Sequence, residues 1–399
     1  MKNKLSRYTI ILILANLLIF PSCEKNPIDD TPYQPVYLNE YELFEEVSTT
    51  EIVSSISETG IFPSETSVFV QYNVKVYRIT YFTVSHNNDP IVASGALLVP
   101  DAQNSLPLLS FQHGTITEES SAPSNFQSFY TDAATVFAST GFIIALPDYI
   151  GYGESKSIPH PYEHRASLAT SCRDMIRATY EFFKVQKIEQ PSQQLFLSGY
   201  SEGGFATMAT YKLLQEQHSN EFIITGVTVG AGAYNKTEFA NYIINSTENQ
   251  QHINSFVWVL DVYNAIYPNL KRPLNYYFNE PWATTIANYG PFSDIEQNPH
   301  LLFNEDFIQN FSAGNDIELN AALADNDCYN WIPYSPLQMY HGTNDVYVPY
   351  FNSSTAYEAM VNNGATNVEL IPIIGGDHET SVTDYFTGTF LFFFNLLNE

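Results

Sequence analysis

The fold is decided by the stretch Ser198-Gly199-Tyr200-Ser201-Glu202-Gly203-Gly204, which follows the apolar segment Leu195–Leu197. It contains the pattern G-x-S-x-G with Ser201 at the centre, and the sequence after it has the small residues and periodicity of a helix. Glycines on both sides of the serine permit a tight turn between a strand and a helix, which leaves the serine oxygen exposed. The pattern therefore predicts a nucleophilic serine at Ser201.

Two apolar segments later in the chain are each followed by a residue that a serine nucleophile needs. Asp345 follows the segment 337–340, and His378 lies in a glycine-rich loop after 368–374. The histidine serves as the base toward the serine, and the acid orients the histidine. The order Ser201, Asp345, His378 is the one expected for a serine in this kind of turn. The alternatives are a turn-capping aspartate and a surface histidine, and the joint placement favours a catalytic triad.

An oxyanion hole requires backbone N–H groups that point at the developing negative oxygen. We expect one from Glu202, directly after the nucleophile, and another from the loop that contains Gly114 and Thr115. His113 in the same loop is interpreted as bracing the loop, in preference to acting directly in catalysis. Asp148 is likewise expected to hold its own glycine-containing loop through the backbone.

Hydrophobic patterning predicts the sheet and the helices that flank it. Apolar and polar residues alternate over 68–84 and 91–99, as in paired antiparallel strands. Short, continuously apolar segments follow, as in strands buried on both faces of a parallel sheet, at 106–111, 142–146, 195–197, 223–229, 337–340 and 368–374. Helix-like stretches lie between them, at 126–139, 165–185, 203–217, 353–363 and 385–397. This alternation predicts an α/β fold with a mostly parallel central sheet and helices on both faces.

One region interrupts this alternation. The residues from about 234 to 334 have helical patterning and many aromatic side chains, and we expect them to form a helical cap inserted into a domain that spans 47–399. Its aromatic residues could line an acyl or aryl pocket or pack the cap onto the sheet, and packing is favoured for each residue. The residues in question are Phe256, Trp258, Tyr263, Tyr276 and Tyr277.

The amino terminus has the pattern of a bacterial lipoprotein signal peptide. Residues 1–22 contain three early positive charges and an apolar run too short to span a bilayer comfortably, and a small residue precedes Cys23. This predicts lipidation of Cys23, a tether over 23–46, and an extracytoplasmic protein anchored to a bacterial membrane, at the outer membrane or cell surface. A plain secretory signal with an incidental cysteine is the alternative.

Composition excludes some partners. The 399 residues contain 16 Lys+Arg and 43 Asp+Glu, which gives a formal net charge of −27 and argues against a nucleic-acid partner. No cofactor or metal is expected, because His160 and His164 have no further ligands nearby in the sequence. A disulfide between Cys172 and Cys328 is possible in an oxidising compartment, but free thiols are favoured.

The chain resembles the α/β-hydrolase superfamily, and within it the secretory-lipase branch. The motifs that carry the resemblance are Gln112-His113-Gly114-Thr115, Asp148-x-x-Gly151-x-Gly153, Gly199–Gly203 and His341–Asp345, in that order and at similar intervals. The resemblance implies hydrolysis of a carboxyl ester by Ser201, His378 and Asp345 through an acyl-enzyme. The substrate would be an ester with an acyl, lipid or acylated-glycan group.

Two other functions stay open at this point. A serine peptidase of the same fold would need a polar or charged pocket for a peptide. A surface lipoprotein that binds glycans or proteins without catalysis would fit the aromatic content, although a complete Ser–His–Asp set counts against it.

Overall fold

A computed structural model describes residues 33–398 of the chain. The predicted signal peptide, Cys23 and the first part of the predicted tether lie outside these residues. By its contacts the chain divides into Met1–Tyr33 and the compact unit Gln34–Glu399, which holds the sheet, its helices and the cap.

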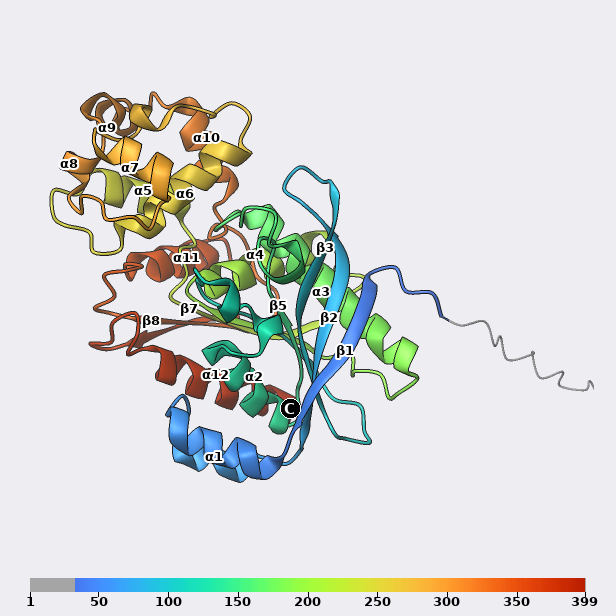
Figure 1. The fold of residues 1–399 in the computed structure, drawn as a ribbon. Helices are drawn as coiled ribbons and strands as arrows, with labels where there is room; N and C mark the ends of the chain where they lie inside the picture. The colour runs from blue at the N-terminus through green and yellow to red at the C-terminus, as the bar shows by residue number, and fades with distance from the viewer. Residues whose placement is uncertain (1–32, 399) are drawn as a thin grey trace, which may run out of the picture. The chain divides into compact units, whose positions relative to one another are not determined.

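A nine-stranded sheet in the order β1-β2-β3-β5-β4-β6-β7-β8-β9 forms the centre of this unit (Figure 1). The pairings β1–β2, β2–β3 and β3–β5 are antiparallel, and all the others are parallel. The sheet is therefore mostly parallel, as predicted. The strands are β1 (Leu38–Val47), β2 (Val74–Val84), β3 (Pro90–Pro100), β4 (Leu108–Gln112), β5 (Ile143–Pro147), β6 (Leu195–Tyr200), β7 (Ile224–Gly230), β8 (Leu337–Gly342) and β9 (Val368–Ile373).

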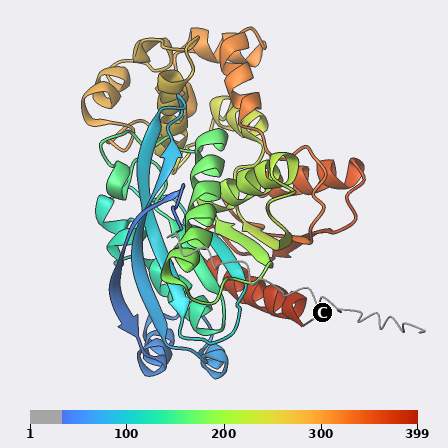
Figure 2. The ribbon, with the colours of Figure 1, turned by 90° about the vertical axis from the view of Figure 1, so that its right-hand side faces the viewer.

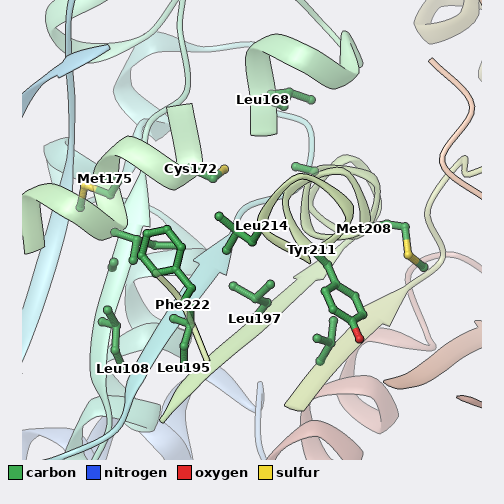
Figure 3. Close-up of a cluster of buried hydrophobic side chains, with 14 of the residues drawn as sticks. Leu108, Leu168, Cys172, Met175, Leu195, Leu197, Met208, Tyr211, Leu214 and Phe222 are labelled. Carbon is green, nitrogen blue, oxygen red and sulfur yellow. The ribbon is translucent and has the colours of Figure 1, made fainter. Parts of the chain in front are cut away.

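Helices cover both faces of the sheet because the central strands are apolar on both faces. Leu195 and Leu197 of β6 share one buried cluster with α3 (Arg165–Gln186), α4 (Glu202–Gln217) and α11 (Phe351–Asn362). Figure 3 shows this cluster, with Leu195 and Leu197 beneath the helical residues Cys172 and Leu214. The intervening Phe196 packs on the opposite face.

That opposite face is covered by α1 (Thr49–Thr59), α2 (Phe129–Ser139) and α12 (Val382–Leu397). A capping box at Ser48 and Glu51 begins α1, and the Ser128 side chain caps α2. The segments predicted to be helical in this part of the chain are therefore helices, and α1 is an additional one. Short 3-10 turns lie at η1 (Ser64–Phe69), η2 (Glu119–Ser121), η3 (Pro123–Asn125), η4 (Gly153–Ser155) and η5 (Leu274–Tyr276).

The chain between β7 and β8 forms a helical cap. Its helices group together beyond one end of the sheet in both views (Figures 1 and 2). They share a buried cluster that, apart from Tyr162, consists of cap residues, so the cap has a core of its own. The cap helices are α5 (Lys236–Ile244), α6 (Ile253–Ile266), α7 (Trp282–Tyr289), α8 (Pro299–Leu302), α9 (Glu305–Ser312) and α10 (Ile317–Asp325).

The structure corrects two sequence predictions. The predicted tether over 23–46 is wrong from Leu38 onward, because Leu38–Val47 pairs with β2 as an edge strand. Nearly every β1 side chain except Leu38 is exposed, so the segment lacks the apolar alternation typical of a strand. The predicted strand over 68–84 starts only at Val74, since Ser64–Phe69 forms a 3-10 turn.

None of the helices in the described part of the chain is long and apolar enough to cross a membrane.

Candidate active site

Ser201 stands in a strained turn between β6 and α4. Its φ of 61° and ψ of −124° are rare for a residue with a side chain, and its N–H donates to the Gly230 carbonyl over 2.8 Å. A Cβ at Gly199 would lie 2.3 Å from the Gly203 carbonyl oxygen, and one at Gly203 would lie 2.1 Å from that of Gln112. Only glycine fits at these two positions, which explains the residues on both sides of the predicted nucleophile.

The structure brings Ser201, His378 and Asp345 together. His378 Nε2 lies 2.9 Å from Ser201 Oγ, and His378 Nδ1 lies 2.6 Å from Asp345 Oδ2. Each residue follows the carboxyl end of a parallel strand, where the three ends meet at one edge of the sheet. The Tyr200 hydroxyl donates to the His378 carbonyl over 2.8 Å and so holds the histidine loop.

The Asp345 carboxylate is held in its charged form. Its Oδ1 accepts the backbone N–H groups of Tyr347 and Val348, over 2.8 and 2.9 Å. Burial would raise the pKa of Asp345, but hydrogen bonds from His341 and His378 outweigh burial and lower it. An ionised Asp345 requires the proton on His378 Nδ1, which leaves Nε2 as the acceptor that faces Ser201.

The residues predicted for the oxyanion hole have different relations to Ser201. Glu202 is the first residue of α4, so its backbone N–H is one of the unpaired donors of a helix start. Thr115 lines the same cavity as Ser201 and His378, and its hydroxyl lies 3.0 Å from the Tyr162 hydroxyl. Gly114 packs closely, since a Cβ there would lie 2.4 Å from the Tyr130 hydroxyl oxygen.

Two buried histidines brace the loops of the site. His113 lies between the carbonyls of Gly114 and Asp148, at 2.7 and 3.1 Å. This agrees with the predicted bracing role, and burial lowers the pKa of His113. His160 lies 2.6 Å from the Ile150 carbonyl and 2.8 Å from Oε1 of Glu202, so it fixes the residue next to the nucleophile.

Two cavities meet at Ser201. The inner cavity lies beneath the cap and has a volume of about 30 Å³. It is lined by Tyr162, Glu163, Ser201, Lys236, Phe239, Ile243, Gln250, His252, Ser255, Phe256, Val259, Leu323, Val346, Tyr347 and Val348. The outer cavity has a volume of about 480 Å³. It is lined by Gly60, Ile61, Thr115, Thr117, Phe129, Tyr130, Tyr200, Ser201, Phe292, Tyr347, His378, Glu379, Val382 and Thr383. Ser201 and Tyr347 line both.

Tyr347 separates the two cavities and connects the cap to the triad. Its hydroxyl lies 2.5 Å from Ser255 Oγ of α6, and its ring stacks on His252 with centroids 3.9 Å apart. The Tyr347 ring also contacts the His378 ring, with centroids 4.8 Å apart and the planes tilted by 49°. Sequence reasoning missed this residue, although it lies only two positions after Asp345.

The cap aromatics have different positions. Phe256 lines the inner cavity, and Trp258 stacks on Tyr162 with centroids 4.1 Å apart. Tyr263 and Tyr277 are buried in the cap core, and Tyr276 packs against it. The three tyrosines are therefore packing residues, but they pack within the cap's own core and not onto the sheet as predicted, and of the five aromatics Phe256 is the one that lines the inner cavity.

The last features to place are the two cysteines and any cluster that could bind a metal. Cys172 and Cys328 are buried free thiols. In the part of the chain that the structure describes, no group of His, Cys, Asp and Glu side chains could hold a metal ion.

A comparison with models of protein families identifies the family of this chain. The family model described as secretory lipase matches residues 122–388, which include the Ser201 turn, the cap and the Asp345 and His378 loops. The chain belongs to the secretory lipase family. Secretory lipases are ester hydrolases of the α/β-hydrolase fold, so the resemblance seen in the sequence motifs is confirmed. None of the curated proteins matches the chain.

Solved structures similar to this secretory lipase show the same fold. A candidate hydrolase from Legionella pneumophila has a TM-score of 0.80 at 22% identity, with 90% of this chain and 98% of that chain covered. The rice cell wall degrading esterase LipA of Xanthomonas oryzae has a TM-score of 0.73 at 24% identity, with 88% and 94% covered. Lipase A of Candida antarctica has a TM-score of 0.61 at 14% identity, with 88% and 82% covered.

Proposed function

We propose that this secretory lipase is a serine carboxyl-ester hydrolase in which Ser201 is the nucleophile, His378 the base and Asp345 the orienting acid. The observation that carries the proposal is the hydrogen-bond chain from Ser201 Oγ to His378 Nε2 at 2.9 Å and from His378 Nδ1 to Asp345 Oδ2 at 2.6 Å. The strained backbone of Ser201 supports it further, because such strain persists where a function requires it.

The acylation step follows from these contacts. Ser201 Oγ forms a bond to the ester carbonyl carbon while its proton moves to His378 Nε2. The carbonyl oxygen becomes an oxyanion, which accepts hydrogen bonds from the backbone N–H of Glu202 and from the Gly114–Thr115 loop. The bond between the carbonyl carbon and the alcohol oxygen then breaks, and His378 gives its proton to the leaving alcohol.

Deacylation reverses the proton movements with water as the nucleophile. His378 Nε2 takes a proton from water as the water oxygen attacks the acyl carbon. The bond to Ser201 Oγ breaks, the carboxylic acid leaves, and His378 returns the proton to Ser201. Asp345 stays ionised throughout and stabilises the charged form of His378.

The two cavities separate the two parts of the ester. His378 must protonate the leaving alcohol, and His378 lines the outer cavity but not the inner one. The alcohol therefore leaves through the outer cavity. The acyl group stays on Ser201 and extends into the inner cavity beneath the cap, which at about 30 Å³ must widen to admit a chain of several carbons.

Hydrolysis of p-nitrophenyl esters from acetate to palmitate, with Ser201→Ala beside the wild type, tests the proposal. The variant should lose on the order of 10⁶-fold in kcat, as when a serine nucleophile is removed elsewhere. A folded wild-type protein that hydrolyses none of these esters but cleaves amides would indicate a peptidase. Ligand binding unaffected by Ser201→Ala, without turnover, would indicate a binding protein.

We also propose that the enzyme is exported and anchored to a bacterial membrane through lipid on Cys23. The support is the sequence pattern of residues 1–23. Labelling with radioactive palmitate tests it, since wild type should incorporate label and Cys23→Ala should not. Label that persists in the variant would remove the anchor from the proposal.

A further inference from the structure

A buried ion pair lines the inner cavity. Lys236 Nζ donates to Oε2 of Glu163, and the two side chains are only 3% and 8% exposed. Glu163 comes from the loop before α3, whereas Lys236 begins the first helix of the cap. Both residues line the cavity that contains Ser201. Charged residues are rarely buried in an otherwise apolar cavity without a reason, because their desolvation costs free energy.

The surroundings of the pair leave it able to bind a ligand. Lys236 Nζ also lies over the ring of Phe205, 4.2 Å from the centroid, one helical turn after Ser201. Among the hydrogen bonds of residues 33–398, this pair uses one carboxylate oxygen and one of three ammonium hydrogens. The second carboxylate oxygen and two hydrogens remain. The rest of the cavity is largely apolar, with Phe239, Ile243, Phe256, Val259, Leu323 and Val346.

The backbone of Glu163 is strained at this point. Its φ of 51° lies in the left-handed region, which a glutamate seldom adopts. The Tyr263 hydroxyl donates to the Glu163 carbonyl over 2.9 Å, and the neighbouring Tyr162 stacks on Trp258. The cap therefore holds Glu163 in a conformation that turns its carboxylate toward the cavity and Lys236.

We infer that this ion pair selects esters whose acyl group carries a hydroxyl several atoms from the carbonyl, either an alcohol or a phenol. The pair has no net charge, so a charged substrate group would leave an unpaired charge in an apolar cavity. A hydroxyl both donates and accepts hydrogen bonds, so one group can donate to Glu163 and accept from Lys236. A plain alkyl chain would desolvate the pair without replacing these bonds.

This inference rests on the proposed ester hydrolysis and on the acyl group occupying the inner cavity. The alternative for the ion pair is a purely structural role, in which it ties the loop before α3 to the cap. A structural role would change stability and general activity. It would not change the preference between two esters that differ only in a hydroxyl.

The test compares each p-nitrophenyl alkanoate, from about six to eight carbons, with the same ester that carries a terminal hydroxyl, because shorter hydroxylated esters cyclise to lactones without an enzyme. The ratio of kcat/KM, hydroxylated over plain, should reach about tenfold or more at one chain length in the wild type. In the double variant Glu163→Leu/Lys236→Met it should fall to about one. The matched control Lys212→Met/Glu216→Leu changes a partly exposed pair on α4, away from both cavities, and should keep the wild-type ratio.

Each result of this comparison tests either the inference about the ion pair or the proposed ester hydrolysis. A wild type that hydrolyses plain and hydroxylated esters equally at every length overturns the inference and leaves the proposed function intact. A preference that survives the double variant also overturns it. If the double variant does not fold, the wild type alone tests the inference. A ratio of hydroxylated to plain kcat/KM that is the same at every acyl chain length would exclude a hydroxyl site at a fixed distance from Ser201. A wild type that hydrolyses no ester removes the proposed function, and the inference with it.

Discussion

The inner and outer cavities share Ser201 and Tyr347 but differ in almost everything else. The inner cavity measures about 30 Å³, lies beneath the cap and includes the buried pair Glu163–Lys236. The outer cavity measures about 480 Å³, and its lining includes His378 and several exposed residues of the loops around the sheet. The inner cavity is the smaller and more enclosed of the two, whereas the outer cavity is wider and more open.

We infer from this difference that selection of the acid and selection of the alcohol are divided between two parts of the chain. The inner cavity takes most of its lining from the cap, so in the proposed mechanism the insertion between β7 and β8 determines which acyl groups fit. The outer cavity is lined mainly by the loop after α1, by α2, by the loops around Thr115 and His378 and by α12, and Phe292 is the one cap residue in its lining. Substitutions in one cavity should therefore change one half of the ester specificity and leave the other half unchanged.

Apart from loss of the nucleophile itself, the largest effect is expected from Asp345→Asn, because Asp345 orients His378, which acts on every ester. The carboxylate accepts from His378 Nδ1 over 2.6 Å, and an amide can present an N–H there instead, which favours the wrong tautomer. We expect kcat to fall about 10⁴-fold for every ester, whatever its acyl or alcohol size. Steady-state kinetics with p-nitrophenyl acetate and butyrate measure this.

The matched control for that variant is Asp377→Asn. Asp377 is directly before His378, but it is exposed and its Oδ1 accepts from the backbone N–H groups of Glu379 and Thr380, which an asparagine oxygen can also do. Its kcat should stay within about threefold of the wild type. Equal losses in the two variants would contradict the assignment of Asp345 as the orienting acid.

A smaller and more selective effect is expected from Val259→Phe in the inner cavity. Val259 lies on α6 and is buried against the cavity, so the larger ring occupies acyl space. The ratio of kcat/KM for p-nitrophenyl octanoate over acetate should fall about tenfold or more. Thermal melting accompanies the kinetics, because overpacking a buried site costs about 1–3 kcal/mol of stability.

The counterpart in the outer cavity is Thr383→Phe. Thr383 lies on α12 and is exposed at the outer cavity, so the change should reduce hydrolysis of bulky acetate esters, such as benzyl acetate, relative to methyl acetate. The octanoate-to-acetate ratio should stay at the wild-type value. Either variant that alters both series together would show that the cavities do not act separately.

The sequence was sufficient for the parts of the fold with strong patterns. Continuous apolar runs gave the parallel strands, and the helices between them followed. Edge strand β1 (Leu38–Val47) was missed because its side chains are nearly all exposed and four of them are acidic. Helix α1 begins with the serine and glutamate of a capping box, a signal that is readable at Ser48 and Glu51.

The candidate site was predictable only where each residue follows a strand. Ser201, Asp345 and His378 lie next to one another because parallel strands end at the same edge of a sheet. Glu163 and Lys236 are 73 positions apart in loops and cap helices, and no periodicity relates them. Likewise, nothing in the sequence indicates that His252 of the cap stacks on Tyr347. Contacts between the cap and the domain depend on how the cap docks, which local patterns do not encode.

The smallest effect concerns that stack and depends on pH. Burial lowers the pKa of His252, the charge of His378 lowers it further, and Asp345 and Glu379 oppose the change. Because the pKa of His252 is lower in the folded protein than in the unfolded chain, His252 binds a proton more readily in the unfolded chain. The contribution of His252 to stability is therefore complete above about pH 6.5 and is lost as pH falls toward the lower folded pKa. His252 is largely exposed, so solvent screening keeps the effect below about 0.5 kcal/mol.

The variant His252→Phe isolates this contribution, because phenylalanine retains a ring for the stack on Tyr347 and cannot titrate. Melting temperatures measured from about pH 8 to pH 5 should fall slightly more for the wild type than for the variant. The octanoate-to-acetate ratio of kcat/KM should also change more with pH in the wild type than in the variant, since His252 lines the inner cavity and not the outer one. A wild type that loses less stability than the variant on acidification would show that Asp345 and Glu379 outweigh burial at His252, and that the cap is held more firmly at low pH.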